Sequence, residues 1–363
     1  MADNKRIFYA IEQFGFMPVG ASTFTAAHGV QSVGITTNFD LTQVFELGQL
    51  AIYDQIEQVP SVEVTSEKAL DGYPLLFHLA TINAPAGTLV GRSTMTTTVG
   101  LSIFPDTNDC GSGTPIAEVA MSGMVVSSLT YTFPVDGQCT ESVTLVGNDK
   151  RWRDTGTIFS GQFVGNDDAP LAGHVAARFN VVFDVPSGAT TDVNGQVVAL
   201  TTVLPTDIYG ISSSGTNPVL SGSGAHVQGI TISADLGRDQ LFELGRRFPF
   251  FRYVTFPVQV TTEISVLGTK WDGISATEAG GENGAPAGSN LKNQSIRVYV
   301  DDGTFISCGT KNKLSSVSYG GGDATTGGGN VTLTYRYITY NDLTVKHPAD
   351  PTIALASGAT VAV

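Results

Sequence analysis

The sequence has few cysteines and few basic residues. Its three cysteines, Cys110, Cys139 and Cys308, are an odd number at wide spacing, which fits neither a disulfide framework nor a zinc site. Only 14% of the 363 residues are charged, and 33 acidic residues outnumber 19 basic ones, so the formal net charge is −14. An acidic chain lacks the basic stripe with which nucleic-acid-binding proteins displace counterions. We therefore predict no specific binding of nucleic acid.

Long apolar runs and catalytic motifs are also missing. No apolar run approaches the roughly 18 residues of a membrane-spanning helix. Glu12 interrupts the apolar stretch near the N-terminus, so no signal peptide is predicted. Phosphate-binding loops, nucleophile elbows and zinc-protease motifs do not occur, and the five histidines are scattered. We predict no catalytic, cofactor-binding or metal-binding residues, no membrane contact and no enzymatic activity.

The composition favours short strands. Glycine accounts for 42 residues, and valine, threonine and serine recur in alternating runs. Valine and threonine fit a pleated, half-buried surface, whereas glycine and proline mark turns. A mainly β fold with many turns is therefore predicted.

The chain also repeats itself. Gly34-Ile35-Thr36 followed by Asp40-Leu41 recurs 195 residues later as Gly229-Ile230-Thr231 followed by Asp235-Leu236. Phe45-Glu46-Leu47-Gly48 recurs 197 residues later, as Phe242-Glu243-Leu244-Gly245. Two further matches lie at offsets of 196 and 188: residues 62–67 with 258–263, and residues 143–145 with 331–333. We predict a first copy at residues 1–155, a connector or arm at 156–204, a second copy at 205–346 and a tail at 347–363.

The pattern predicts the same plan in both copies. A strand at residues 34–37 or 229–233 leads to a short amphipathic helix, because Leu41, Val44 and Phe45 are spaced as on one helical face. Gly48 and Gly245 stand where such helices would end in a left-handed residue. Residues 177–183 of the connector have the pattern of a strand.

The copies differ in charge around the expected helix. The second copy carries Arg238, Arg246, Arg247 and Arg252, whereas the first carries Asp54 and Glu57. One interpretation is drift on two solvated surfaces. The other is that the first copy of one subunit contacts the second copy of its neighbour, with opposite charges setting the register. These six residues are the candidate subunit interface.

Two stretches carry a resemblance to a known family. Asp235-Leu236-Gly237-Arg238, followed by Phe242-Glu243-Leu244-Gly245-Arg246-Arg247 and by residues 253–264, resembles a stretch of the virion structural proteins of tailed bacteriophages. Phe133-Pro134-Val135-Asp136-Gly137, continuing into residues 141–148, resembles another. Together with the duplication, this resemblance implies a tail tube protein. The implied fold is two tandem, internally duplicated tail-tube-like β-barrel or sandwich domains, each with one short helix.

The resemblance also implies a function. Three chains would form a pseudo-sixfold ring, and stacked rings would form a channel for DNA ejection in the virion tail, assembled in the bacterial cytoplasm. The implied partners are further copies of the chain, a tape measure protein, and the sheath, tail terminator and baseplate, with genomic DNA passing unbound. A neck, baseplate or capsid decoration protein stays open as an alternative. A carbohydrate-binding sandwich is less well supported, because Trp152 and Trp271 are far apart in sequence.

Overall fold

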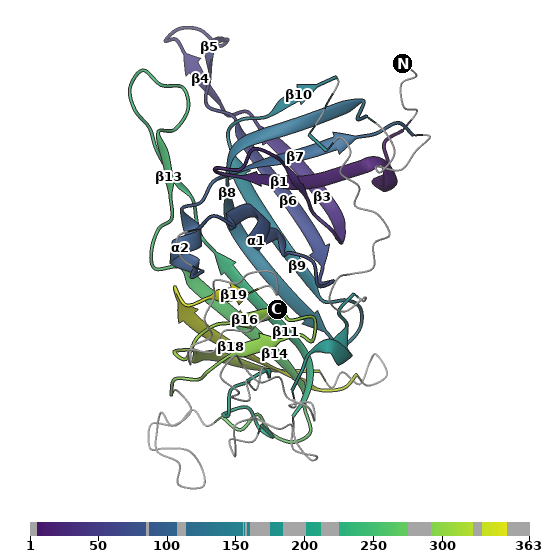
Figure 1. Cartoon of the computed structure of the whole chain (residues 1–363). Coiled ribbons are helices and arrows are strands. Elements are labelled where there is room, and N and C mark those ends of the chain that lie inside the picture. The colour runs from purple at the N-terminus through teal and green to yellow at the C-terminus, as the bar shows by residue number, and fades with distance from the viewer. Residues whose placement is uncertain are drawn as a thin grey trace.

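A computed structural model of the chain describes residues 6–84, 87–106, 114–154, 156, 158–159, 175–183, 201–211, 225–274, 292–321 and 329–346. These residues form a mainly antiparallel β structure, which confirms the predicted class (Figure 1). No helix in this part of the chain is long and apolar enough to span a membrane. Cys110, much of the predicted connector at 156–204 and the predicted tail at 347–363 lie outside the described residues.

Eight strands form one continuous sheet. Four come from the first predicted copy, in the order β3 (Val30–Asn38), β6 (Ser61–Ala69), β9 (Thr140–Gly147) and β8 (Ala117–Pro134). Four come from the second, in the order β11 (His226–Asp235), β14 (Gln259–Leu267), β18 (Thr332–Tyr340) and β17 (Lys313–Gly320). The strand β8 pairs with β11 and thereby joins the two groups head to tail.

A second layer covers one face of this sheet. The first half of the 18-residue strand β8 leaves the main sheet to pair with β7 (Thr97–Ile103) and β10 (Arg151–Arg153), and β7 pairs with β1 (Glu12–Pro18), which in turn pairs with β2 (Thr25–Ala26). The helices α1 (Leu76–Thr81) and α2 (Leu89–Ser93) lie in front of the sheet in Figure 1. Over the second copy, the cover is β15 (Arg297–Tyr299), β16 (Phe305–Ser307) and β19 (Thr344–Lys346). The core lies between the two layers.

The two predicted amphipathic helices are wrong, because both segments form β-hairpins. In the first copy β4 (Leu41–Phe45) pairs with β5 (Ile52–Glu57), and in the second β12 (Asp239–Leu241) pairs with β13 (Phe251–Tyr253). An amphipathic helix needs a surface that buries its apolar face. The hairpin β4–β5 projects beyond the sheet, at the top of Figure 1, and among the described residues its two strands pair only with each other. Both α-helices lie instead between β6 and β7, and the described part of the second copy has none.

The connector also differs from its prediction. Residues 177–183 form a short 3-10 turn, η2 (Arg178–Asn180), with single bridges on either side of it. Ala177 bridges to Gln138 in the first copy, and Val181 bridges to Val300 in the second. In its described residues the connector therefore reaches both copies with isolated backbone contacts and adds a strand to neither.

Candidate assembly interface

The internal seam, where β8 and β11 meet, joins the two predicted copies. Ile232 lies opposite Tyr131, and both side chains are fully buried. Just past the strand end, the Leu236 amide donates to the Ser127 carbonyl at 2.8 Å, and the Leu236 side chain is 1% exposed. The strand β11 is thus held against β8 by backbone hydrogen bonds and by core packing.

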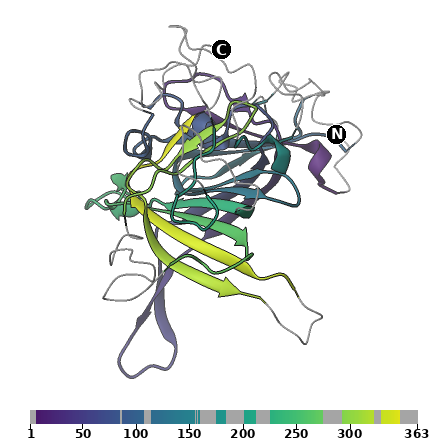
Figure 2. The same ribbon diagram turned by 90° about the horizontal axis from the view of Figure 1, so that it is seen from below.

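The sheet ends in two strands that each have a single partner among the described residues. At one end β3 pairs only with β6, and at the other β17 pairs only with β18. Figure 2 shows β17 and β18, in yellow-green to yellow, extending away from the body of the molecule. An edge strand presents a row of unpaired N–H and C=O groups and is a template for another strand. By strand order, β3 corresponds to β11 and β17 to β8, the two strands of the internal seam.

Residues that the internal seam buries have exposed counterparts at the free edge. Phe39, which follows β3 as Leu236 follows β11, is 70% exposed. Leu41, the counterpart of Arg238, is 52% exposed. At the other edge Tyr319, the counterpart of the buried Tyr131, is 62% exposed. The free edges therefore expose apolar area at positions that are covered where two copies meet.

The six predicted interface residues are partly brought together inside one chain. The Arg238 guanidinium donates to the carbonyls of Val126 and Ser93 in the first copy, and Nη1 lies 2.7 Å from the Ser93 oxygen. Burial, together with the neighbouring positive charge of Arg252, lowers the pKa of Arg238 to about 10. These contacts fix the second copy against the first.

Arg252 and Arg247 also cross between the copies. Arg252 Nη2 donates to Asn148 Oδ1 at 2.8 Å, and burial lowers the pKa of this arginine. Arg247 Nη2 lies 3.7 Å from Glu57 Oε2, with both side chains exposed. Surface pairs of this kind contribute roughly 0–1 kcal/mol. The pair therefore helps to orient the two hairpins and stabilises them little.

The remaining two charged residues make local contacts. Arg246 Nη1 lies 3.3 Å from Glu243 Oε2 within its own hairpin, and the Asp54 carboxylate accepts from the Gln55 amide at 2.8 Å. The structure thus places Arg238, Arg247, Arg252 and Glu57 between the copies of one chain. A role for these charges between chains stays a prediction.

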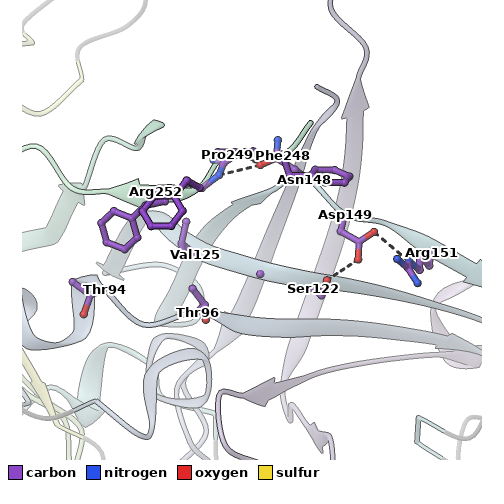
Figure 3. A pocket seen from close by; sticks show the side chains of 13 residues that line it. Thr94, Thr96, Ser122, Val125, Asn148, Asp149, Arg151, Phe248, Pro249 and Arg252 are labelled. Atoms are coloured by element: carbon purple, nitrogen blue, oxygen red, sulfur yellow. Dashed lines mark hydrogen bonds and ion pairs between the residues drawn. The ribbon is translucent and has the colours of Figure 1, made fainter. Parts of the chain in front are cut away.

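A cavity of about 450 Å³ lies where the second hairpin meets the first copy (Figure 3). Phe248, Pro249 and Arg252 close it on one side, and Ser122 and Asp149 line the other. Ser122 Oγ donates to Asp149 Oδ2 at 2.6 Å, so these polar groups already bond one another. Among the described residues, no group of three or more His, Cys, Asp or Glu side chains could hold a metal ion. The cavity offers contact surface and shows no catalytic arrangement.

Sequence reasoning found the charged residues but missed the edges. The strand order, which comes from the structure, places equivalent strands at the internal seam and at both ends of the sheet. The sequence match at offset 195 hides the true equivalence of β3 and β11, because it is two residues out of register with the structure. The β-bulges align Gln31 with Gln228, at an offset of 197.

Comparisons with known proteins find likeness only to solved structures. No family model and no curated protein matches the chain. Three solved chains match 42% of it, each with a TM-score of 0.32. They come from the baseplate of the anti-feeding prophage (11% identity, 97% of that chain), from its tube-terminating cap (15%, 95%), and from the sheath/tube terminator of the PVC extracellular contractile injection system (17%, 99%). TM-scores this low do not establish a shared fold.

Proposed function

We propose that the chain is a structural subunit of a bacteriophage tail tube that assembles head to tail into rings. One observation carries the proposal: β8, at the end of the first copy's part of the sheet, pairs with β11, at the start of the second copy's part, while the equivalent strands β17 and β3 have one partner each among the described residues at the two ends of the sheet. A contact between unlike surfaces generates a closed ring when its rotation closes. Two copies per chain, at residues 1–155 and 205–346 with the connector at 156–204, give a pseudo-sixfold ring from three chains.

The uncovered face of the sheet suits a channel wall. Its side chains are mostly hydroxyls, among them Thr65, Thr144 and Thr231, and its acids include Glu63 and Glu263. Arg336 on this face lies 3.7 Å from Glu263, so its charge is partly offset. A protein that binds DNA releases counterions through basic side chains. A hydroxyl-rich wall with added carboxylates lets DNA and a tape measure protein pass without holding phosphate.

The hairpin ends suit contacts between stacked rings. Leu47 and Leu244 stand at equivalent places in the two hairpins and are fully exposed. Each belongs to the same four-residue sequence, Phe-Glu-Leu-Gly. A partner that receives both ends must itself present the same surface twice, as an adjacent ring of the same chain does. Sheath, tail terminator and baseplate proteins are the expected partners at the outside and the ends of the tube, in a virion tail assembled in the host cytoplasm.

Electron microscopy tests the proposal directly. Negative-stain images of concentrated protein, with light-scattering mass on the same sample, are expected to show hollow tubes or rings with the mass of three chains and six repeated units. Rings that never stack, even at high concentration, would favour the alternative of a neck, baseplate or capsid decoration protein. A chain that stays monomeric at every concentration would contradict ring formation by the chain alone.

A further inference from the structure

The internal seam supplies a complete template for how two copies pair. Ser233 lies opposite Thr130 along the seam. Past the strand end, Leu236 and Ser127 form a hydrogen-bonded pair. Hydrogen-bonded and non-hydrogen-bonded pairs alternate along an antiparallel ladder. Counting back from Leu236, Ser233 and Thr130 form a non-hydrogen-bonded pair, in which the Cα atoms come to within about 4.5 Å.

Two pairs of β-bulges show which residues of the copies are equivalent. Gln31 is the extra residue of β3, and Gln228 is the extra residue of β11. Ser127 is the extra residue of β8, and Ser315 is that of β17. A bulge occupies one defined position of a strand pair. The equivalence of the edge strands with the seam strands is therefore fixed, at offsets of 197 and 188.

The hairpins confirm the first of these offsets independently. Gln43 lies opposite Gln55 in the first hairpin, and Gln240 lies opposite Arg252 in the second. Both strands of the hairpin are thus displaced by 197 residues. The same offset runs from the bulge of β3 to the end of β5, so no residue is inserted or deleted between them.

We propose that β17 of one chain pairs antiparallel with β3 of a second copy of the chain, with Tyr319 opposite Ile35 and Ser318 opposite Thr36. The register follows from moving the seam pairs of β8 and β11 by the two offsets. This inference rests on the proposed head-to-tail assembly and adds the residue-by-residue contact. It also makes Thr36 and Ser318 a non-hydrogen-bonded pair, like Ser233 and Thr130.

The chemistry of the two edges fits this register. Tyr319, which is exposed in the single chain, meets Ile35, and both lie on the side of the sheet that carries the core. Gly34 falls opposite Gly320, so no side chain separates the two backbones at that pair. Past the end of β3, Phe39 takes the place that Leu236 occupies in the internal seam. The apolar area that the chain exposes at its edges is thereby covered by the second copy.

A second register can be written from the sequence alone. The match of Gly34-Ile35-Thr36 with Gly229-Ile230-Thr231 at an offset of 195 places Asn38 opposite Ser318, two residues away. Both registers keep the same side chains on the same face, because side chains alternate with a period of two. Hydrophobic patterning therefore does not distinguish the two registers. A measurement that reports which residue lies opposite Ser318 is required.

Engineered cysteines distinguish the two registers. In a Cys110→Ser background, a chain with Thr36→Cys is mixed with a chain carrying Ser318→Cys, oxidised and run on a non-reducing gel. The Cα distance of a non-hydrogen-bonded pair lies within the range that a disulfide spans. The matched control replaces Thr36→Cys by Asn38→Cys. The strands β3 and β17 lie at opposite ends of the sheet, so the bond forms only between chains.

We expect a covalent dimer from the Thr36 and Ser318 variants and little or none from the Asn38 control. One chain carrying both Thr36→Cys and Ser318→Cys is expected to give a closed covalent ring. Assemblies of the expected mass that cross-link through Asn38 would overturn the register while leaving the proposed function intact. Chains that neither associate by light scattering nor cross-link in any combination would overturn both.

Discussion

Phe39 at the free edge and Leu236 in the internal seam are equivalent positions, and alanine at each separates assembly from folding. Leu236 is 1% exposed and belongs to the core, so Leu236→Ala is expected to lower the free energy of unfolding by about 2–5 kcal/mol. Phe39 is 70% exposed in the single chain. Phe39→Ala is therefore expected to change the free energy of unfolding by no more than about 0.5 kcal/mol.

Association between chains should respond strongly to Phe39→Ala. If a second copy covers Phe39 as the first copy covers Leu236, truncation to alanine removes about 1.5–3 kcal/mol from each contact between chains. Every 1.4 kcal/mol is tenfold in an equilibrium constant, so the dissociation constant of the contact should rise by about 10- to 150-fold. Denaturant unfolding of dilute protein measures the first effect, and sedimentation velocity over a concentration series measures the second.

A matched control comes from the connector. Phe179 lies in η2 and is 77% exposed, so Phe179→Ala removes a similar exposed ring away from both edges. It should alter neither unfolding nor association. The reasoning is refuted if Phe39→Ala associates like the unmodified chain, or if Phe179→Ala weakens association as much as Phe39→Ala does.

Three further predictions concern the single chain. Arg238→Ala leaves the carbonyls of Val126 and Ser93 without their donor and should lower the free energy of unfolding by about 1–3 kcal/mol or more, whereas Arg246→Ala, at an exposed local pair, should stay within about 0.5 kcal/mol in the same denaturant titration. Burial raises the pKa of Glu141 in the folded state, so the contribution of this residue to stability is present below its unfolded pKa and is lost as pH rises through its folded pKa. The free energy of unfolding, measured from pH 4 to 8, should therefore fall less in Glu141→Gln than in the unmodified chain. Identical pH dependence in the two proteins would contradict this. Burial raises the pKa of Cys139 and Cys308 to about 12, so a thiol reagent at pH 8 should reach them only after denaturant is added.

Much of the fold could be predicted from local pattern. Apolar residues alternate in 127–133 and 141–146, a pattern that indicates strands, and the structure has the second half of β8 and β9 there. Asp302-Gly303 is a dipeptide typical of turns, and it forms the turn before β16, where Gly303 has a φ of 89°. The strands could be predicted because each has side chains that alternate between the buried and the exposed face of the sheet.

The hairpins show where local pattern fails. Leu41, Val44 and Phe45 have helical spacing, yet the segment projects from the sheet and has no surface on which a helix could bury that face. Gly48 and Gly245 do adopt positive φ, 94° and 84°, as predicted, but in the hairpin loops and not after a helix. A left-handed glycine marks a chain reversal in either case. Its position in sequence does not reveal which kind of segment it follows.

The two seams of a head-to-tail ring need not be alike, and the substitutions between the copies show how they differ. At the internal seam Arg238 and Arg252 reach backbone carbonyls and Asn148 across the copies. At the free edge the equivalent residues are Leu41 and Gln55, which carry no charge. Buried cations that bond specific acceptors suit a contact formed once, during folding. Exposed leucine and phenylalanine suit a contact that must remain soluble in the single chain and form only when a second copy arrives, since apolar contact is favourable without exact geometry. Charge reversal at Arg246 and Arg247 should therefore weaken association between chains less than loss of Phe39, and the opposite ranking in sedimentation would show that charge governs the contact between chains.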